Sequence, residues 1–131
     1  MKTDSLVLIP YTEYGVPSGN YDGSSETSFT GDRQKGVTYY LRNKSHQSVR
    51  FTCDDFVGTI KIQMCLDSDP SDDDTNWVTL YTFPTDDSSS LDGSTAISAD
   101  YSVSITARST WVRAVVDSFT GGTINSVKLS Y

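Results

Sequence analysis

The stretch GTIKIQMCL, residues 58–66, decides the fold class of this chain. Its side chains alternate with a period of two, with Ile60, Ile62, Met64 and Leu66 on one face and Lys61, Gln63 and Cys65 on the other. Successive side chains of a β-strand point to opposite faces, so the pattern predicts a strand that buries one face. Since no part of the sequence shows a sustained helical stripe, we expect an all-β protein.

Similar alternation on both sides of this stretch predicts about eight strands. Besides 58–66, the predicted strands are residues 6–10, 37–41, 49–53, 77–83, 101–108, 111–116 and 123–131. Polar turns separate them, and the acidic residues 67–76 are expected at the tip of a hairpin. Strands of this length cannot bury their faces in one flat sheet, so we expect a two-sheet antiparallel β-sandwich, jelly-roll-like in form.

The length of 131 residues predicts one domain that spans residues 1–131. Within it, residues 14–33 are rich in Gly, Ser, Asn and Asp, and Tyr21 and Phe29 are their apolar anchors. This composition predicts a long N-terminal loop or arm. Two interpretations stay open: an arm that becomes ordered on a neighbouring subunit, and a loop that is simply mobile.

The charge of the chain excludes some classes of partner. The chain has ten Lys and Arg residues and seventeen Asp and Glu residues, which gives a formal net charge of −7. Nucleic acid is therefore not expected as a partner, because affinity for phosphates comes from basic side chains. No apolar run approaches the roughly 18 residues of a membrane span, so no membrane association is expected either.

Residues that could carry catalysis are sparse. His46 is the single histidine, and it lies in a polar turn where nothing in the sequence pairs it with a nucleophile and an orienting acid. Most carboxylates fall in predicted loops, where a rigid catalytic pair is not expected. Cys53 and Cys65 have opposite strand phases, which favours free thiols over a disulfide. We therefore expect a protein that is not an enzyme.

The acidic hairpin tip is the one candidate metal site. Calcium takes several carboxylate oxygens from loops of this kind, and the candidate ligands are Asp67, Asp69, Asp72 and Asp74. The ordered spacing of a calcium-binding loop is missing, however, and Pro70 interrupts the run. The alternative is a solvated tip, so calcium is the only cofactor to test and the default expectation is none.

Aromatic side chains supply the candidate binding residues. Tyr21 and Phe29 belong to the predicted arm, and Trp77 and Tyr81 to the strand after the acidic tip. Aromatic rings in strands also pack in cores, and this alternative stays open for Trp77 and Tyr81. Of the two tryptophans, we expect Trp111 to be the more buried and Trp77 the more exposed.

Several motifs resemble known proteins. The hairpin formed by residues 58–63 and 74–80 resembles one in small structural proteins of tailed phages, especially those that infect cyanobacteria. The ending is similar too: a Trp-hydrophobe-Arg strand, Trp111 to Ala114, is followed by the Gly121-Gly122 pair and a last strand. The likeness covers about residues 48–131.

The resemblance implies a virion component, made in the host cytoplasm and displayed on the particle. Its expected role is that of a capsid decoration protein or a neck or tail accessory. Its partners would be capsid or tail subunits and further copies of itself, with no catalytic residues involved. The alternative is a carbohydrate-binding or receptor-binding module of a tail fibre, which would bind a host surface glycan.

Overall fold

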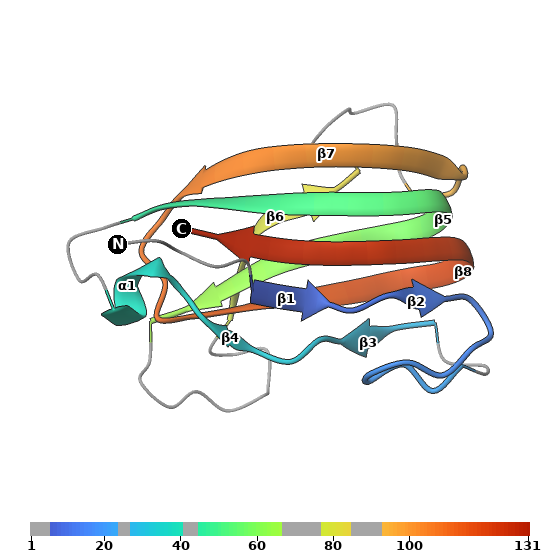
Figure 1. Ribbon diagram of the computed structural model, residues 1–131, viewed down its shortest axis with the longest axis horizontal. Helices are drawn as coiled ribbons and strands as arrows, with labels where there is room; N and C mark the ends of the chain where they lie inside the picture. Colours follow the sequence, from blue (N-terminus) through green and yellow to red (C-terminus); the bar gives the residue numbers. More distant parts are fainter. Residues whose placement is uncertain (1–5, 24–26, 41–44, 67–76, 85–92) are drawn as a thin grey trace.

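The computed structural model describes residues 6–23, 27–40, 45–66, 77–84 and 93–131 (Figure 1). The strands are β1 (Leu6–Ile9), β2 (Thr12–Glu13), β3 (Phe29–Thr30), β4 (Gln34–Lys35), β5 (His46–Cys65), β6 (Val78–Phe83), β7 (Ile97–Thr106) and β8 (Trp111–Ser130), and one helical turn forms α1 (Val37–Tyr40). All eight strands belong to one antiparallel sheet, so the all-β prediction is confirmed. Among the described residues, no helix has the length and apolar character needed to cross a membrane.

Two strands of 20 residues each, β5 and β8, form the centre of the sheet. Figure 1 shows both crossing the molecule, turning at the same end and running back. They pair along nearly their whole length, from Ser48 opposite Ser130 to Cys65 opposite Trp111. The prediction of separate strands on either side of residues 54–58 and 117–122 was therefore wrong.

Local backbone geometry explains why these strands bend instead of ending. The β5–β8 register shifts between Asp54 and Val57 and again before Thr59. Asp55, Ser118 and Gly122 have positive φ angles at the same place. Bulged residues of this kind increase the local bend while the pairing continues on both sides. The composition of residues 117–122 is typical of a turn between two strands, but these residues form a bend within the single strand β8.

The bend folds the sheet over, and the core lies between the two halves. The first half of β5 pairs with β7 and the second half with β6. Phe51 in the first half stacks on Phe83 of β6, with 4.7 Å between ring centroids. The Nε2 of Gln47, in the first half of β5, donates to the Sδ of Met64, in the second half, at 3.4 Å. The two-sheet sandwich and its jelly-roll form both stay predictions, because the described strands form one sheet.

The described part of segment 14–33 packs on its own chain. Tyr21 and Phe29 are buried, and their ring centroids lie 5.2 and 6.2 Å from that of Phe119 in β8. Phe29 also begins β3, which pairs with β8 at Val116. These contacts place Tyr21 and Phe29 in the core, and neither ring is available to a partner on the surface of the folded chain.

The predicted strand at 37–41 was wrong, because α1 occupies residues 37–40. The chain turns here against the connection between β7 and β8. The amides of Gly36 and Thr38 donate to the carbonyls of Thr110 and Ser109, and the Ser109 amide donates to Thr38 Oγ1. A Cβ on Gly36 would lie 2.4 Å from the Ser109 hydroxyl oxygen, so this close approach needs glycine.

Candidate binding surfaces

The sequence predicts no catalytic residue, and the described part of the chain contains no candidate metal site. His46 begins β5 and is exposed. Among the described residues, no group of three or more His, Cys, Asp or Glu side chains could hold a metal ion. The calcium candidates Asp67, Asp69, Asp72 and Asp74 lie outside the described residues, and calcium binding there stays a prediction.

Both cysteines are free and buried, as the strand phases predicted. Cys53 faces the core, and burial raises the pKa of its thiol because the thiolate would lose its hydration. The thiolate is the reactive form of cysteine, so Cys53 is held in its inert form at neutral pH.

Trp77 lies in a buried polar cluster and only 6% of it is exposed, so the expectation of an exposed ring was wrong. The guanidinium of Arg113 lies 4.4 Å from the centre of the indole ring. Arg113 Nε donates to Gln63 Oε1 at 2.8 Å, and Gln63 Nε2 donates to Thr79 Oγ1 at 3.1 Å. These contacts cover the face of β5 that the sequence pattern assigns to solvent.

Tyr81 is half-buried, and its ring stacks on Phe51 with 5.8 Å between centroids. The four predicted binding residues thus do not meet on one exposed surface. Tyr21 and Phe29 pack with Phe119, Trp77 packs beneath Arg113, and Tyr81 lines the core.

Trp111 is half-exposed, which reverses the expected order of the two tryptophans. Arg33 lies 4.7 Å above its ring, and the edge of Tyr39 meets it at a centroid distance of 5.4 Å. Lys35 in turn lies 4.7 Å from the centre of the Tyr39 ring. Sequence reasoning missed this cation–aromatic group, although the spacing of Arg33 and Lys35 places both on one face of a strand.

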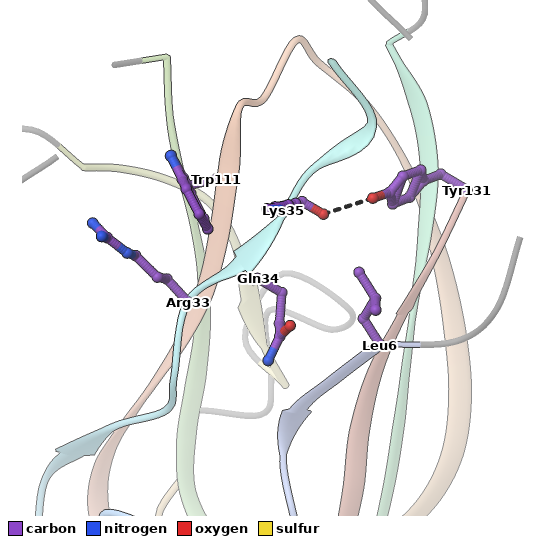
Figure 2. Close-up of a pocket in the computed structure, with 6 residues that line it drawn as sticks. All are labelled: Leu6, Arg33, Gln34, Lys35, Trp111 and Tyr131. Atoms are coloured by element: carbon purple, nitrogen blue, oxygen red, sulfur yellow. Dashed lines mark hydrogen bonds between the residues drawn. The ribbon is translucent and has the colours of Figure 1, made fainter. Parts of the chain in front are cut away.

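Arg33, Lys35 and Trp111 of this group also line a pocket of about 300 Å³, between β1, β4 and the two ends of the β8 segment (Figure 2). Its lining consists of Leu6, Arg33, Gln34, Lys35, Trp111 and Tyr131. The Tyr131 hydroxyl donates to the carbonyl of Lys35 at 2.8 Å and fixes one wall. Aromatic rings combined with cations suit a polar or anionic ligand.

The hairpin of β5 and β6 exposes large apolar side chains. Val78 and Leu80 of β6 are 61% and 40% exposed, and Leu66, directly after β5, is 67% exposed. Val78 pairs with Met64, and Leu66 is two residues beyond Met64, so Leu66 and Val78 are diagonal neighbours across the two strands. Among the described strands, β6 pairs with β5 alone, so Val78 and Leu80 lie on an edge strand of the sheet, and Leu66 follows the neighbouring strand β5.

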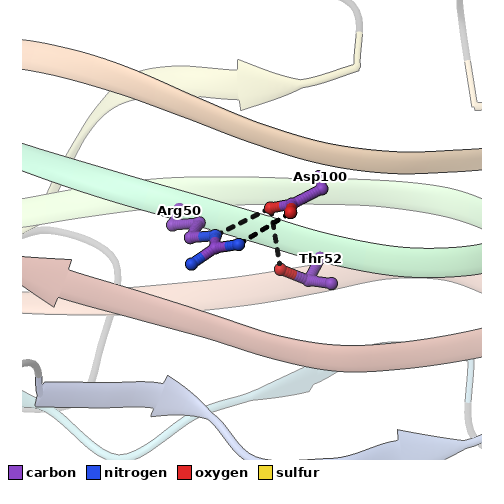
Figure 3. Close-up of polar contacts among 3 residues, drawn as sticks. All are labelled: Arg50, Thr52 and Asp100. Atoms are coloured by element: carbon purple, nitrogen blue, oxygen red, sulfur yellow. Dashed lines mark hydrogen bonds and ion pairs between the residues drawn. The ribbon is translucent and has the colours of Figure 1, made fainter.

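On the outer surface, Arg50 of β5 and Asp100 of β7 form a two-pronged ion pair (Figure 3). Arg50 Nε and Nη2 each donate to a different carboxylate oxygen at 2.7 Å, and Thr52 Oγ1 donates to Oδ1 at 3.4 Å. The hydrogen bonds from Arg50 lower the pKa of Asp100, and Asp100 raises the pKa of Arg50.

Comparison of the chain with protein-family models, curated protein sequences and solved structures gave no match. The resemblance of residues 48–131 to phage structural proteins therefore stays a prediction.

Proposed function

We propose that this chain is a non-enzymatic structural protein of a tailed-phage particle. It acts by binding neighbouring virion proteins, as a capsid decoration protein or as a neck or tail accessory. The sequence resemblance supports the particle, and the exposed side chains at the β5–β6 hairpin support the mode of action.

The apolar edge formed by Leu66, Val78 and Leu80 is the observation that carries the proposal. Single exposed apolar residues are common, but three large ones at the same end of one strand pair favour a protein-binding surface there. A partner that covers this edge would remove apolar area from water at roughly 25 cal/mol per Å². Its strand could also pair with the unused backbone groups of β6.

The test is cryo-electron microscopy of the phage particles whose genome encodes this chain. We expect density for the sheet at symmetry-related positions on capsid or tail subunits, with β6 at the contact. Absence of such density from particles that carry the gene would refute the structural role.

A binding assay with purified particles tests the surface itself. Val78→Asp or Leu80→Asp should lower the amount of chain that sediments with particles at least tenfold, because a carboxylate would be buried in the contact. The matched control is Val7→Asp on β1, an exposed valine of another edge strand. Equal loss for the control would argue against the β6 edge.

A second candidate function, carbohydrate or receptor binding, is favoured by the pocket beside Trp111. Its ring and the Arg33 and Lys35 cations would suit an acidic sugar residue. A glycan array tests this candidate. Specific binding that Trp111→Ala abolishes, while the exposed Tyr11→Ala control retains it, would support it; an array without binders would exclude it for the glycans tested.

A further inference from the structure

Among the described strands, β7 has the longest edge that no other strand pairs with. It pairs with β5 from His46 opposite Thr106 to Phe56 opposite Ile97, and no other described strand pairs with it. Natural edge strands are usually protected by Pro, Lys, bulges or shortness. The ten residues ISADYSVSIT contain no proline, glycine, lysine or arginine.

The two faces of β7 differ in a way that leaves its apolar side incompletely covered. Ile97, Ala99, Tyr101 and Val103 pack against the core, yet each is only partly buried. The intervening residues Ser98, Asp100, Ser102 and Ser104 are exposed. Another strand beside β7 would cover the remaining apolar area and pair the backbone groups of this edge.

A second copy of β7 fits this edge in the antiparallel register centred on Tyr101. Residues whose numbers sum to 202 then face each other, so Ile97 meets Ile105, Ala99 meets Val103 and Ser98 meets Ser104. From Ile97 to Ile105, every apolar side chain faces an apolar one and every polar side chain a polar one. A two-fold axis makes this contact self-complementary and closes it at two copies.

The charges are compatible with the same register. Asp100 would face Ser102 of the second copy, so no two carboxylates would be directly opposite each other. Within the chain, Ser102 pairs with Arg50 of β5, so Arg50 lies in the same cross-strand row as the incoming carboxylate. Arg50 already binds its own Asp100, which reduces repulsion between the two copies.

We propose that two copies of this chain associate through antiparallel pairing of their β7 strands and form one continuous sheet. This contact uses the β7 edge and leaves the apolar β6 edge free. It does not depend on the particle role, because purified chain alone is sufficient to form it.

Sedimentation equilibrium of the purified chain over a wide concentration range tests the proposal. The mass should rise with concentration from 14.4 kDa towards twice that value. Ser102→Asp should raise the dissociation constant at least tenfold, because the new carboxylate faces Asp100 of the second copy. Arg50 lies across from Ser102 in the same chain, so this variant should still fold.

Two variants serve as controls. Ser102→Asn has nearly the shape of the aspartate variant without its charge and should retain the dimer. Ser126→Asp adds the same charge at β8, opposite Thr52 and away from the β7 edge, and should also retain it. Circular dichroism and thermal melting establish that each variant is folded.

A chain that stays monomeric at all concentrations would overturn the proposal, as would a dimer that Ser102→Asp leaves unchanged. If the wild-type chain is monomeric but Ser102→Asp abolishes binding to particles, the edge accepts a strand of another protein, and self-pairing is refuted while the particle role survives.

Discussion

Arg113 is a cation whose side chain is almost entirely buried, with 3% of the residue exposed. Its guanidinium lies over the Trp77 ring and its Nε donates to Gln63. Burial of a charge is costly, so these contacts must offset a large loss of hydration. Removing the side chain would leave the Gln63 oxygen without this donor and a cavity beside the indole.

We expect Arg113→Ala to lower the free energy of unfolding by about 2–4 kcal/mol, from the lost packing, hydrogen bond and cation–π contact. The control is Arg108→Ala, an exposed arginine, which should change it by less than about 0.5 kcal/mol. Urea denaturation at pH 7 measures both. Equal effects would show that the buried cluster contributes no more than surface charge.

The ion pair of Arg50 and Asp100 makes stability depend on acid pH. Because Arg50 lowers the pKa of Asp100, the pair stabilises the fold above the unfolded-state pKa, roughly 3.9, and loses this contribution as pH falls through the lower folded-state pKa. The stability difference between the wild-type chain and Asp100→Asn should therefore persist from pH 7 to about 4 and then vanish.

Unfolding titrations at several pH values, with carboxyl NMR of Asp100, test this linkage. An Asp100 pKa at or above that of an unfolded aspartate would contradict it. The pair is exposed, so we expect only a small effect at pH 7 that weakens further in salt.

Cys53 and Cys65 provide a probe of the folded state. Both are buried, and burial raises the pKa of Cys53, so native protein should react very slowly with a thiol reagent at pH 8. In denaturant, two thiols should react at the rate of a free cysteine. Rapid reaction of one thiol in the native protein would show that its site opens readily.

At the scale of elements, the bend in β5 and β8 depends on one glycine of the Gly121-Gly122 pair. Gly122 has a φ of +83°, and a Cβ there would lie 2.1 Å from the carbonyl oxygen of Asp55. Gly121 has no such constraint, since its Cβ would lie 3.6 Å from Val57. The two neighbours therefore form a matched pair for mutation.

Gly122→Ala should destabilise the chain by about 2–4 kcal/mol, because the strained backbone and the clash with Asp55 must both be accommodated. Gly121→Ala should cost less than about 1 kcal/mol. Thermal or urea unfolding measures the free energy of unfolding of both variants. Similar values would mean that the bend tolerates a side chain at residue 122.

The alternation of side chains predicted most strands correctly because burial on one face imposes a period of two. It failed where the contacts are long-range. The pattern assigned Gln63 to solvent, whereas Arg113, 50 residues further along, covers it. It also marked residues 37–41 as a strand, although hydrogen bonds to Ser109 and Thr110 stabilise a helical turn there.

The candidate surfaces were less predictable than the strands. Trp77 and Trp111 have similar local sequence contexts, and only the neighbours that folding brings to them determine which ring is exposed. Arg33 and Tyr39 reach Trp111 from a segment more than 70 residues earlier in the chain. The edge position of β6 and β7 likewise follows from strand order, which the sequence pattern does not specify.

At the scale of the whole molecule, sharing β5 and β8 between the two halves has a consequence for how the chain folds. Neither half can form alone, because each contains one arm of both strands. Residues that pair are far apart in sequence: 82 positions separate Ser48 from Ser130, and 46 separate Cys65 from Trp111. Such topology gives a high relative contact order and therefore slow folding, on the order of milliseconds to seconds. Strands β1 to β4 and one edge of β5 pair with β8, so a nascent chain leaves them without these partners until β8 emerges.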